Sequence, residues 1–186
     1  MDTTIIMEHS ENDNLLHKKK LIAGNFLPAI ISFLILVFFD QLTKYLIDHN
    51  MDLYDSISVI GNIFEIHYIR NSGAAWGMLA NKQALFYICT MFVIIVGCLL
   101  YIRCAETGKY RDIQSVLLLI LSGAVGNFID RLRFQYVIDF LYFKLIDFPV
   151  FNIADCYVTI GFFLMVILFF FKYKEDDLEI LMKFKK

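Results

Sequence analysis

Apolar residues in this chain gather in four long runs, each close to the roughly 20 residues that a helix needs to cross a bilayer. The runs cover residues 26–47, 83–102, 113–129 and 153–171. We predict a spanning helix for each run, because a helix satisfies its own backbone hydrogen bonds where lipid offers none. The expected fold class is therefore an all-α membrane protein with four transmembrane helices.

A different pattern separates the first two runs. Residues 57–69 alternate loosely between apolar and polar side chains around Gly61-Asn62. Alternation around a Gly-Asn pair is typical of a β-hairpin. We predict a small outward-facing hairpin or sheet in the region of about residues 50–80, with its apolar face on the bilayer surface.

The flanks of the runs predict the orientation, because Lys and Arg gather on the cytoplasmic side of membrane proteins. One side carries Lys18, Lys19, Lys20, Arg103, Lys109, Arg111, Lys172, Lys174, Lys183, Lys185 and Lys186. The other carries Arg70, Lys82, Arg131, Arg133 and Lys144. We therefore expect a cytoplasmic tail at 1–25, a transmembrane domain at 26–171 and a basic cytoplasmic tail at 172–186. Residues 48–82 and 130–152 would face outward.

Composition supports a membrane location and narrows the chemistry. The 186 residues are 59% hydrophobic, with 19 Phe and a net charge of −2. A soluble domain of this size could not bury so much apolar surface, and the charge gives no reason to expect a nucleic-acid partner. No cleavable signal is expected, because residues 1–20 are polar and the run that follows is long enough to remain in the membrane.

The four Cys and four His residues lack the spacings of metal or disulfide sites. No metal and no cofactor is therefore expected.

The polar residues of the apolar part fall near one plane at the outward ends of the runs. By helical rise they lie within about ten ångström of it. They are Asp40, Lys44, Asn71, Asn127, Arg131, Asp139, Asn152 and Asp155. Polar groups at the edge of lipid are costly unless they are paired or used. We therefore predict a functional site at this plane.

Asp139 and Asp155 are the candidate reactive groups. Asp139 stands among large apolar residues, which raise the pKa of a carboxyl group by desolvation. Two carboxyl groups held close together keep one proton between them, so one can act as an acid and the other as a base. Such a pair can direct water at a peptide carbonyl without a metal. The serines show no evident His partner for a triad.

Structural interpretations compete at three places. Asp40 and Lys44, at i and i+4, could form a neutralising pair with Lys44 reaching toward the interface, or could brace a site. Asp130 is interpreted as a helix-end group that its neighbour Arg131 keeps ionised. Asn152 could cap the last helix, with Asp155 as the acid of its first turn.

Five motifs together resemble the lipoprotein signal peptidase family, also called signal peptidase II. They are Asp40-Gln41-Leu42-Thr43-Lys44, Asn71 to Gly77, Gly126 to Arg131, Val137-Ile138-Asp139-Phe140 and Phe151-Asn152-Ile153-Ala154-Asp155. Each is weak alone, whereas the ordered set is specific. The sequence departs from the family pattern at Trp76, where Phe is usual, and at Gln135, where a Gly is common.

The resemblance implies a four-helix aspartic protease of the bacterial inner membrane, with its active site at the outer face. It implies cleavage of prolipoproteins before a diacylglyceryl-modified cysteine, with Asp139 and Asp155 as the catalytic pair. The positions implied to line or brace the site are Asp40, Lys44, Asn71, Gly123, Asn127, Arg131, Asn152 and Ala154. The resemblance also implies inhibition by globomycin-type peptides and contact with membrane lipid. The expected oligomeric state is a monomer.

Two other functions compete with the peptidase interpretation. A small ion-coupled transporter subunit would use membrane acids. The sequence shows no inverted repeat, however, and no acid near the centre of a run, apart from the off-centre Asp40. A structural or assembly subunit would use the motifs only as helix caps.

Overall fold

The computed structural model describes residues 3–73, 83–174 and 177. Its long elements are the helices α1 (Thr3–Asn50), α2 (Gln83–Thr107), α3 (Arg111–Phe134) and α4 (Ile153–Ile167), which continues into the π-helical turn η3 (Leu168–Lys172). Within the described part of the chain, four helices are long and apolar enough to cross a membrane. The prediction of an all-α membrane protein with a small sheet is confirmed.

Helix α1 begins earlier than the predicted span. It runs without interruption from Thr3, and Pro28 lies inside it. Residues 3–25 are polar but contain Gly24 as their only strongly helix-disfavouring residue, so helix can extend beyond the apolar run. The side on which this segment lies stays a prediction. Trp76 and most of the predicted tail 172–186 fall outside the described residues.

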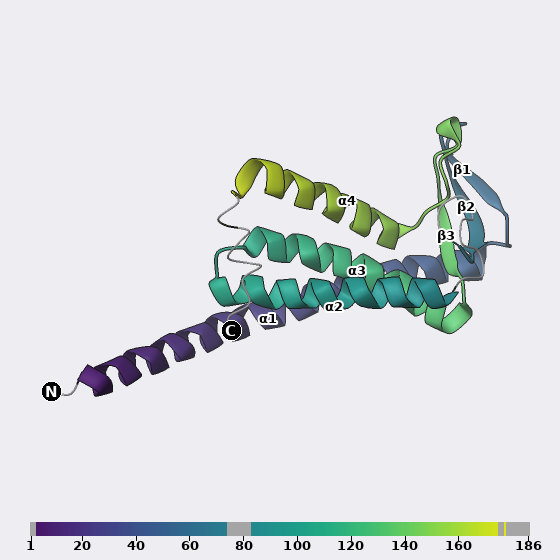
Figure 1. Cartoon of the computed structure of the whole chain (residues 1–186). Helices are drawn as coiled ribbons and strands as arrows, with labels where there is room; N and C mark the ends of the chain where they lie inside the picture. Colours follow the sequence, from purple (N-terminus) through teal and green to yellow (C-terminus); the bar gives the residue numbers. More distant parts are fainter. Residues whose placement is uncertain (1–2, 74–82, 175–176, 178–186) are drawn as a thin grey trace.

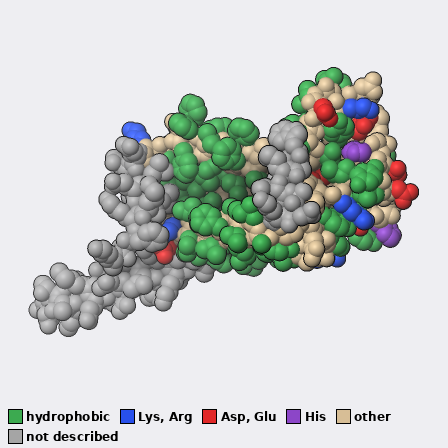
Figure 2. All heavy atoms as spheres, turned by 45° about the vertical axis from the view of Figure 1, so that its right-hand side comes forward, with side chains coloured by type: hydrophobic (Ala, Val, Ile, Leu, Met, Phe, Trp, Pro, Cys, Tyr) green, Lys and Arg blue, Asp and Glu red, His purple; other side chains and the backbone are tan. Residues whose placement is uncertain are grey.

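Helix α3 is the centre of the bundle and packs against α1, α2 and α4 (Figure 1). Of its most apolar stretch, a share of 44% is buried inside the protein, whereas the buried share of the corresponding stretch is 11% or less in each of the other three helices. Those helices therefore turn apolar side chains such as Phe38, Ile88 and Phe163 outward, where lipid can cover them. On the face shown in Figure 2, apolar side chains cover much of the bundle, and most of the visible charged groups lie at its sheet end.

A three-stranded antiparallel sheet stands at one end of the bundle, in the order β1 (Ser56–Ile60), β2 (Phe64–Asn71), β3 (Val137–Tyr142) (Figure 1). The predicted hairpin is present, and Gly61 supplies the positive φ of its turn. The third strand was not predicted. It pairs with β2 so that Ile69 faces Asp139 and Asn71 faces Val137, which brings an acid of the loop after α3 onto the sheet.

The sheet is fixed to the helices by a small apolar core. Tyr68, Ile138 and Phe140 are buried together, with Ile47 of α1 and Ile153 of α4 packed against them. The sheet therefore cannot shift far from the start of α4, because its core residues also contact that helix.

Helix α3 ends in a left-handed residue. Gln135 has a φ of 65°, and its backbone N–H donates to Arg131 O. Gly adopts this conformation without a steric cost, which gives a physical reason for the Gly that is common here in the family that the sequence resembles. Gln135 takes the same conformation, so the turn into β3 forms despite the departure.

Gly123 allows α3 and α4 to approach closely. A Cβ added at Gly123 would lie 2.4 Å from Ala154 O and 2.8 Å from a methyl group of Val158. The first of these is a backbone atom and cannot turn aside. The predicted role of Gly123 in bracing the site therefore has a steric basis.

We expect Gly123→Ala to lower the free energy of unfolding by about 1–3 kcal/mol, because α4 must move to relieve the clash. Gly97→Ala is the matched control: the nearest atoms to its Cβ belong to the Leu121 side chain, and the closest, at 2.8 Å, is a terminal methyl group that can turn aside. Thermal unfolding of both variants in the same detergent checks this. Equal melting temperatures for the two variants would contradict the close approach at Gly123.

Candidate active site

The first turn of α4 positions Asp155. Asn152 caps the helix: its Oδ1 accepts from the Asp155 backbone N–H at 3.0 Å, and Asp155 Oδ2 accepts from the Asn152 N–H at 3.1 Å. This reciprocal pair is a capping box. The predicted cap by Asn152 is confirmed, and the hydrogen bond from the Asn152 N–H to the Asp155 side chain goes beyond the prediction. The capping box uses one carboxylate oxygen of Asp155. The other, Oδ1, accepts from Asn127 Nδ2 at 2.7 Å.

Strand β3 positions Asp139, which is 2% exposed. Its Oδ1 accepts from Asn152 Nδ2 at 2.7 Å, and its Oδ2 accepts from Asn71 Nδ2 at 2.8 Å. Burial and, after it, the charge of Asp155 raise the pKa of Asp139 to about 7, although the two amide donors oppose the shift. The prediction from the sequence that the pKa of Asp139 is raised is confirmed in direction and cause.

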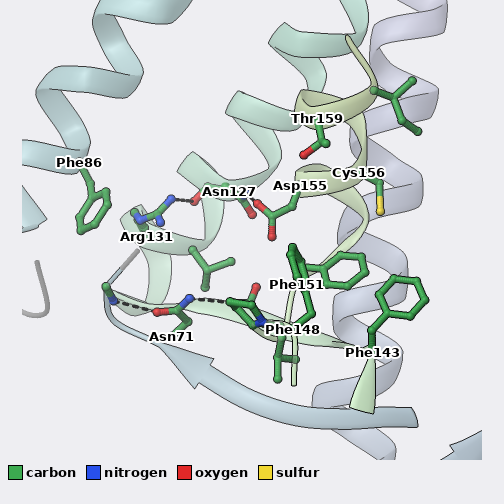
Figure 3. A pocket seen from close by; sticks show the side chains of 16 residues that line it. Asn71, Phe86, Asn127, Arg131, Phe143, Phe148, Phe151, Asp155, Cys156 and Thr159 are labelled. Carbon is green, nitrogen blue, oxygen red and sulfur yellow. Dashed lines mark hydrogen bonds between the residues drawn. The ribbon is translucent and has the colours of Figure 1, made fainter. Parts of the chain in front are cut away.

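Two amides join the two acids. Asn152 Nδ2 donates to Asp139 and lies 3.0 Å from Asn127 Oδ1, while Asn127 Nδ2 donates to Asp155. Both carboxyl groups line one cavity of about 610 Å³, with Asn71, Asn127 and Arg131 (Figure 3). We call this space the dyad cavity. The structure thus brings together the two acids that the sequence singled out.

The rest of the dyad cavity is largely apolar. Phe143, Phe148 and Phe151 form one wall (Figure 3). The ring centroid of Phe151 lies 5.7 Å from that of Phe143 and 5.7 Å from that of Phe148. Across the cavity, the Arg131 guanidinium lies 4.5 Å from the centre of the Phe86 ring. The sequence did not single out these aromatic residues, because Phe occurs throughout the apolar runs.

A buried ammonium group braces the site from behind. Lys44 Nζ lies 2.9 Å from Asp40 Oδ2, 3.1 Å from Asp130 Oδ2 and 2.9 Å from Asn127 Oδ1. Asp40 Oδ1 also accepts from the Ala154 backbone N–H at 2.9 Å. Asp40, Lys44 and Asp130 are each at most 1% exposed. The network links α1, α3 and the start of α4, and it orients the Asn127 amide toward Asp155.

The structure distinguishes between the interpretations left open for these groups. The pair of Asp40 and Lys44 forms, but Lys44 points into the bundle, so the interpretation in which it reaches the interface is wrong. Asp130 is also held differently from the interpretation: its partner is Lys44, not Arg131. Neighbouring residues on a helix point in different directions, which is why the adjacent arginine is not the partner.

Two residues of this brace were missed. Gln41 donates to Asp130 Oδ1 at 2.9 Å and to Gly126 O at 3.1 Å. A Cβ at Gly126 would lie 2.4 Å from Asp40 Oδ2, so a larger residue would displace that carboxylate. Both residues stand inside the quoted motifs, which was the available signal. The strand character of Val137–Tyr142 was also readable from its β-branched and aromatic residues.

Among the described residues, no group of three or more His, Cys, Asp or Glu side chains is arranged to hold a metal ion. The described cysteines, Cys89, Cys98, Cys104 and Cys156, are all free thiols.

Comparisons with known proteins find similar sequences and a similar fold. The family model described as signal peptidase (SPase) II matches residues 32–171. The lipoprotein signal peptidase of Staphylococcus aureus strain JH9 is 40% identical over 154 residues, which are 82% of this chain and 91% of that protein. The same figures hold for the protein of strain Newman.

Solved structures resemble the fold as well. A bacterial membrane enzyme determined by the in meso method at 2.3 Å resolution has a TM-score of 0.72 and 36% identity, covering 86% of this chain and 94% of that one. A second, at 1.9 Å, has a TM-score of 0.68 and 36% identity over 78% of this chain and 94% of that one. The family match and the identity extend over most of the chain, and the chain therefore belongs to the signal peptidase II family.

Proposed function

We propose that Asp139 and Asp155 are the catalytic pair of this peptidase, and that it cuts before a diacylglyceryl-modified cysteine. The chain is a membrane aspartic peptidase that processes prolipoproteins. The single observation that carries the proposal is the cavity lined by both carboxyl groups, which are joined through Asn127 and Asn152. The transporter alternative has no support from the comparisons.

The environment of each acid suggests its role. Asp139 is buried and its raised pKa favours the protonated form, so it keeps the proton of the pair. Asp155 takes a proton from water, which attacks the scissile carbonyl carbon. The Asp139 proton moves toward the oxyanion that forms. Collapse of the tetrahedral intermediate breaks the C–N bond, and the leaving amine takes a proton from the pair.

Other lining groups would position the substrate. Arg131 and Asn71 present donors beside the acids, and the wall of Phe143, Phe148 and Phe151 offers apolar surface to acyl chains or to the signal peptide. An aromatic wall suits a lipid-modified substrate because burying apolar area is favourable and needs no specific geometry. Globomycin-type peptides would occupy the same cavity.

The proposed orientation puts this site at the outer face. A lipid-modified cysteine keeps its acyl chains in the bilayer, so the bond before it lies at the membrane surface. The dyad cavity lies where α3 ends, α4 begins and the sheet covers the bundle (Figure 1). With both termini in the cytoplasm, this end faces outward. We further propose that the enzyme acts as a monomer without a nucleic-acid partner.

We expect Asp139→Asn and Asp155→Asn each to lower cleavage of a lipidated prolipoprotein by on the order of 10³-fold or more, because either amide removes the acid–base pair. Single-turnover assays of the purified variants measure this. Near wild-type cleavage by either variant would refute the pair.

Asp130→Asn is the matched control for these variants. Asp130 is as buried as Asp139, but it contacts Lys44, Gln41 and the Ile138 backbone N–H and does not line the dyad cavity. Its loss weakens the brace, so we expect a lower melting temperature with cleavage retained above that of the dyad variants. Complete loss of cleavage by a folded Asp130→Asn protein would mean that the wrong acid was assigned.

The raised pKa of Asp139 predicts a pH dependence. Because Asp139 must be protonated to act as the acid, activity should persist up to its pKa of about 7 and fall above it, by about tenfold per pH unit. An ordinary carboxyl group would already have lost its proton near pH 4. Cleavage rates from pH 5.5 to 9, with a fixed lipid composition, test this. A rate that stays constant to pH 9 would contradict the assignment.

A further inference from the structure

A second hollow continues from the dyad cavity on the outer side of the sheet. It has a volume of about 730 Å³ and lies between β2 and the segment from Tyr142 to Val150. We call it the outer groove. Asn71, Gly73, Phe148, Pro149 and Val150 line both the dyad cavity and the outer groove. A chain bound at the two acids can therefore pass from one into the other.

The two spaces differ in chemistry. Inside the bundle, the dyad cavity continues past Asp155 to Thr159 and Ile160, which lie farther along the membrane-spanning part of α4. The outer groove is lined by charged and polar pairs instead. Lys144 Nζ lies 2.7 Å from Glu65 Oε1, Tyr142 donates to Asp147 at 2.7 Å, and the His67 ring is hydrogen-bonded to Ser56.

This division matches the two sides of a prolipoprotein around the cut. The signal peptide is apolar and belongs with the membrane, whereas the chain after the lipidated cysteine leads into water. We propose that the outer groove is a subsite for the residues that follow that cysteine, and that the pair of Glu65 and Lys144 selects among them by charge. This inference rests on the proposed function, because the direction of the chain is set by a cut at Asp139 and Asp155.

The length of the outer groove predicts which substrate residues contact it. Glu65, His67, Ile69 and Asn71 of β2 all line it, and Asn71 is hydrogen-bonded to Asp139. The six residue-to-residue steps of strand from Asn71 to Glu65 span about 20 Å. An extended substrate that leaves the two acids along β2 covers the same length per residue as the strand does. Its fourth to sixth residues after the cut would then lie beside His67, Glu65 and Lys144.

Charge at those positions is balanced in the native groove. Lys144 and Glu65 form an ion pair in which the Lys144 side chain is 46% exposed and the Glu65 side chain 10% exposed. Lys144→Glu makes the groove acidic and favours basic substrates. Glu65→Gln leaves Lys144 without its paired carboxylate and favours acidic ones. The two variants therefore shift selectivity in opposite directions, which a general loss of folding would not do.

The experiment uses diacylglyceryl-modified prolipoproteins with three Lys or three Glu at the third to fifth positions after the cysteine, which are the fourth to sixth residues after the cut. We expect the kcat/KM ratio of the Lys substrate to the Glu substrate to rise about fivefold or more in Lys144→Glu and to fall in Glu65→Gln. The shifts should shrink in 1 M NaCl, because salt screens exposed charges. Placing the same charges about 15 residues after the cut should remove the shifts.

Arg133→Glu is the matched control. It makes the same change in charge at the same end of the molecule, on an exposed residue of α3 that is not among the described residues lining either space. The ratio should stay at its wild-type value in this variant. Unchanged ratios in both groove variants, or an equal shift in Arg133→Glu, would overturn the inference while cleavage itself continued. Failure of the proposed function would instead appear as cleavage by Asp139→Asn.

Discussion

The buried ammonium group of Lys44 is the constraint on which the rest of the site depends. A charge removed from water in an apolar bundle is tolerated only if it is paired and hydrogen-bonded, and losing one partner of a buried pair typically costs about 3–5 kcal/mol. Lys44 meets this requirement with Asp40, Asp130 and the Asn127 side-chain oxygen. These partners come from α1 and α3, and Asp40 also binds the backbone of α4 at Ala154.

The same contacts set the amides around the acids. Asn127 accepts from Lys44 through its oxygen, so its nitrogen faces Asp155. Asn152 is held by the capping box and directs its nitrogen to Asp139. An amide can present a donor on only one side, and each of these is fixed by a partner on the other. The polar brace therefore orients the groups around the two acids before any substrate arrives, which is the preorganisation that catalysis needs.

Much of this arrangement could be predicted from the sequence. The lengths of the apolar runs predicted the four helices, and the Gly61-Asn62 pair predicted the hairpin. The polar residues that share one plane predicted that Asp139 and Asp155 lie in one site. The pairing of β2 with β3 could not be predicted this way, because strand partners distant in sequence are not set by local pattern. The partner of Asp130 was missed for a similar reason: Arg131 is its neighbour in sequence, but Lys44 is its neighbour in space.

We predict that Asp139 and Asp155 titrate as one unit, and carbon-13 NMR of labelled aspartates in detergent is the most direct test. Asp139 should titrate near pH 7 in the wild type, and its pKa should fall in Asp155→Asn, because the neighbouring charge is gone. Assignment comes from loss of the signal in Asp139→Asn. An Asp139 carboxyl group that titrates at the same pH with and without Asp155 would contradict the account.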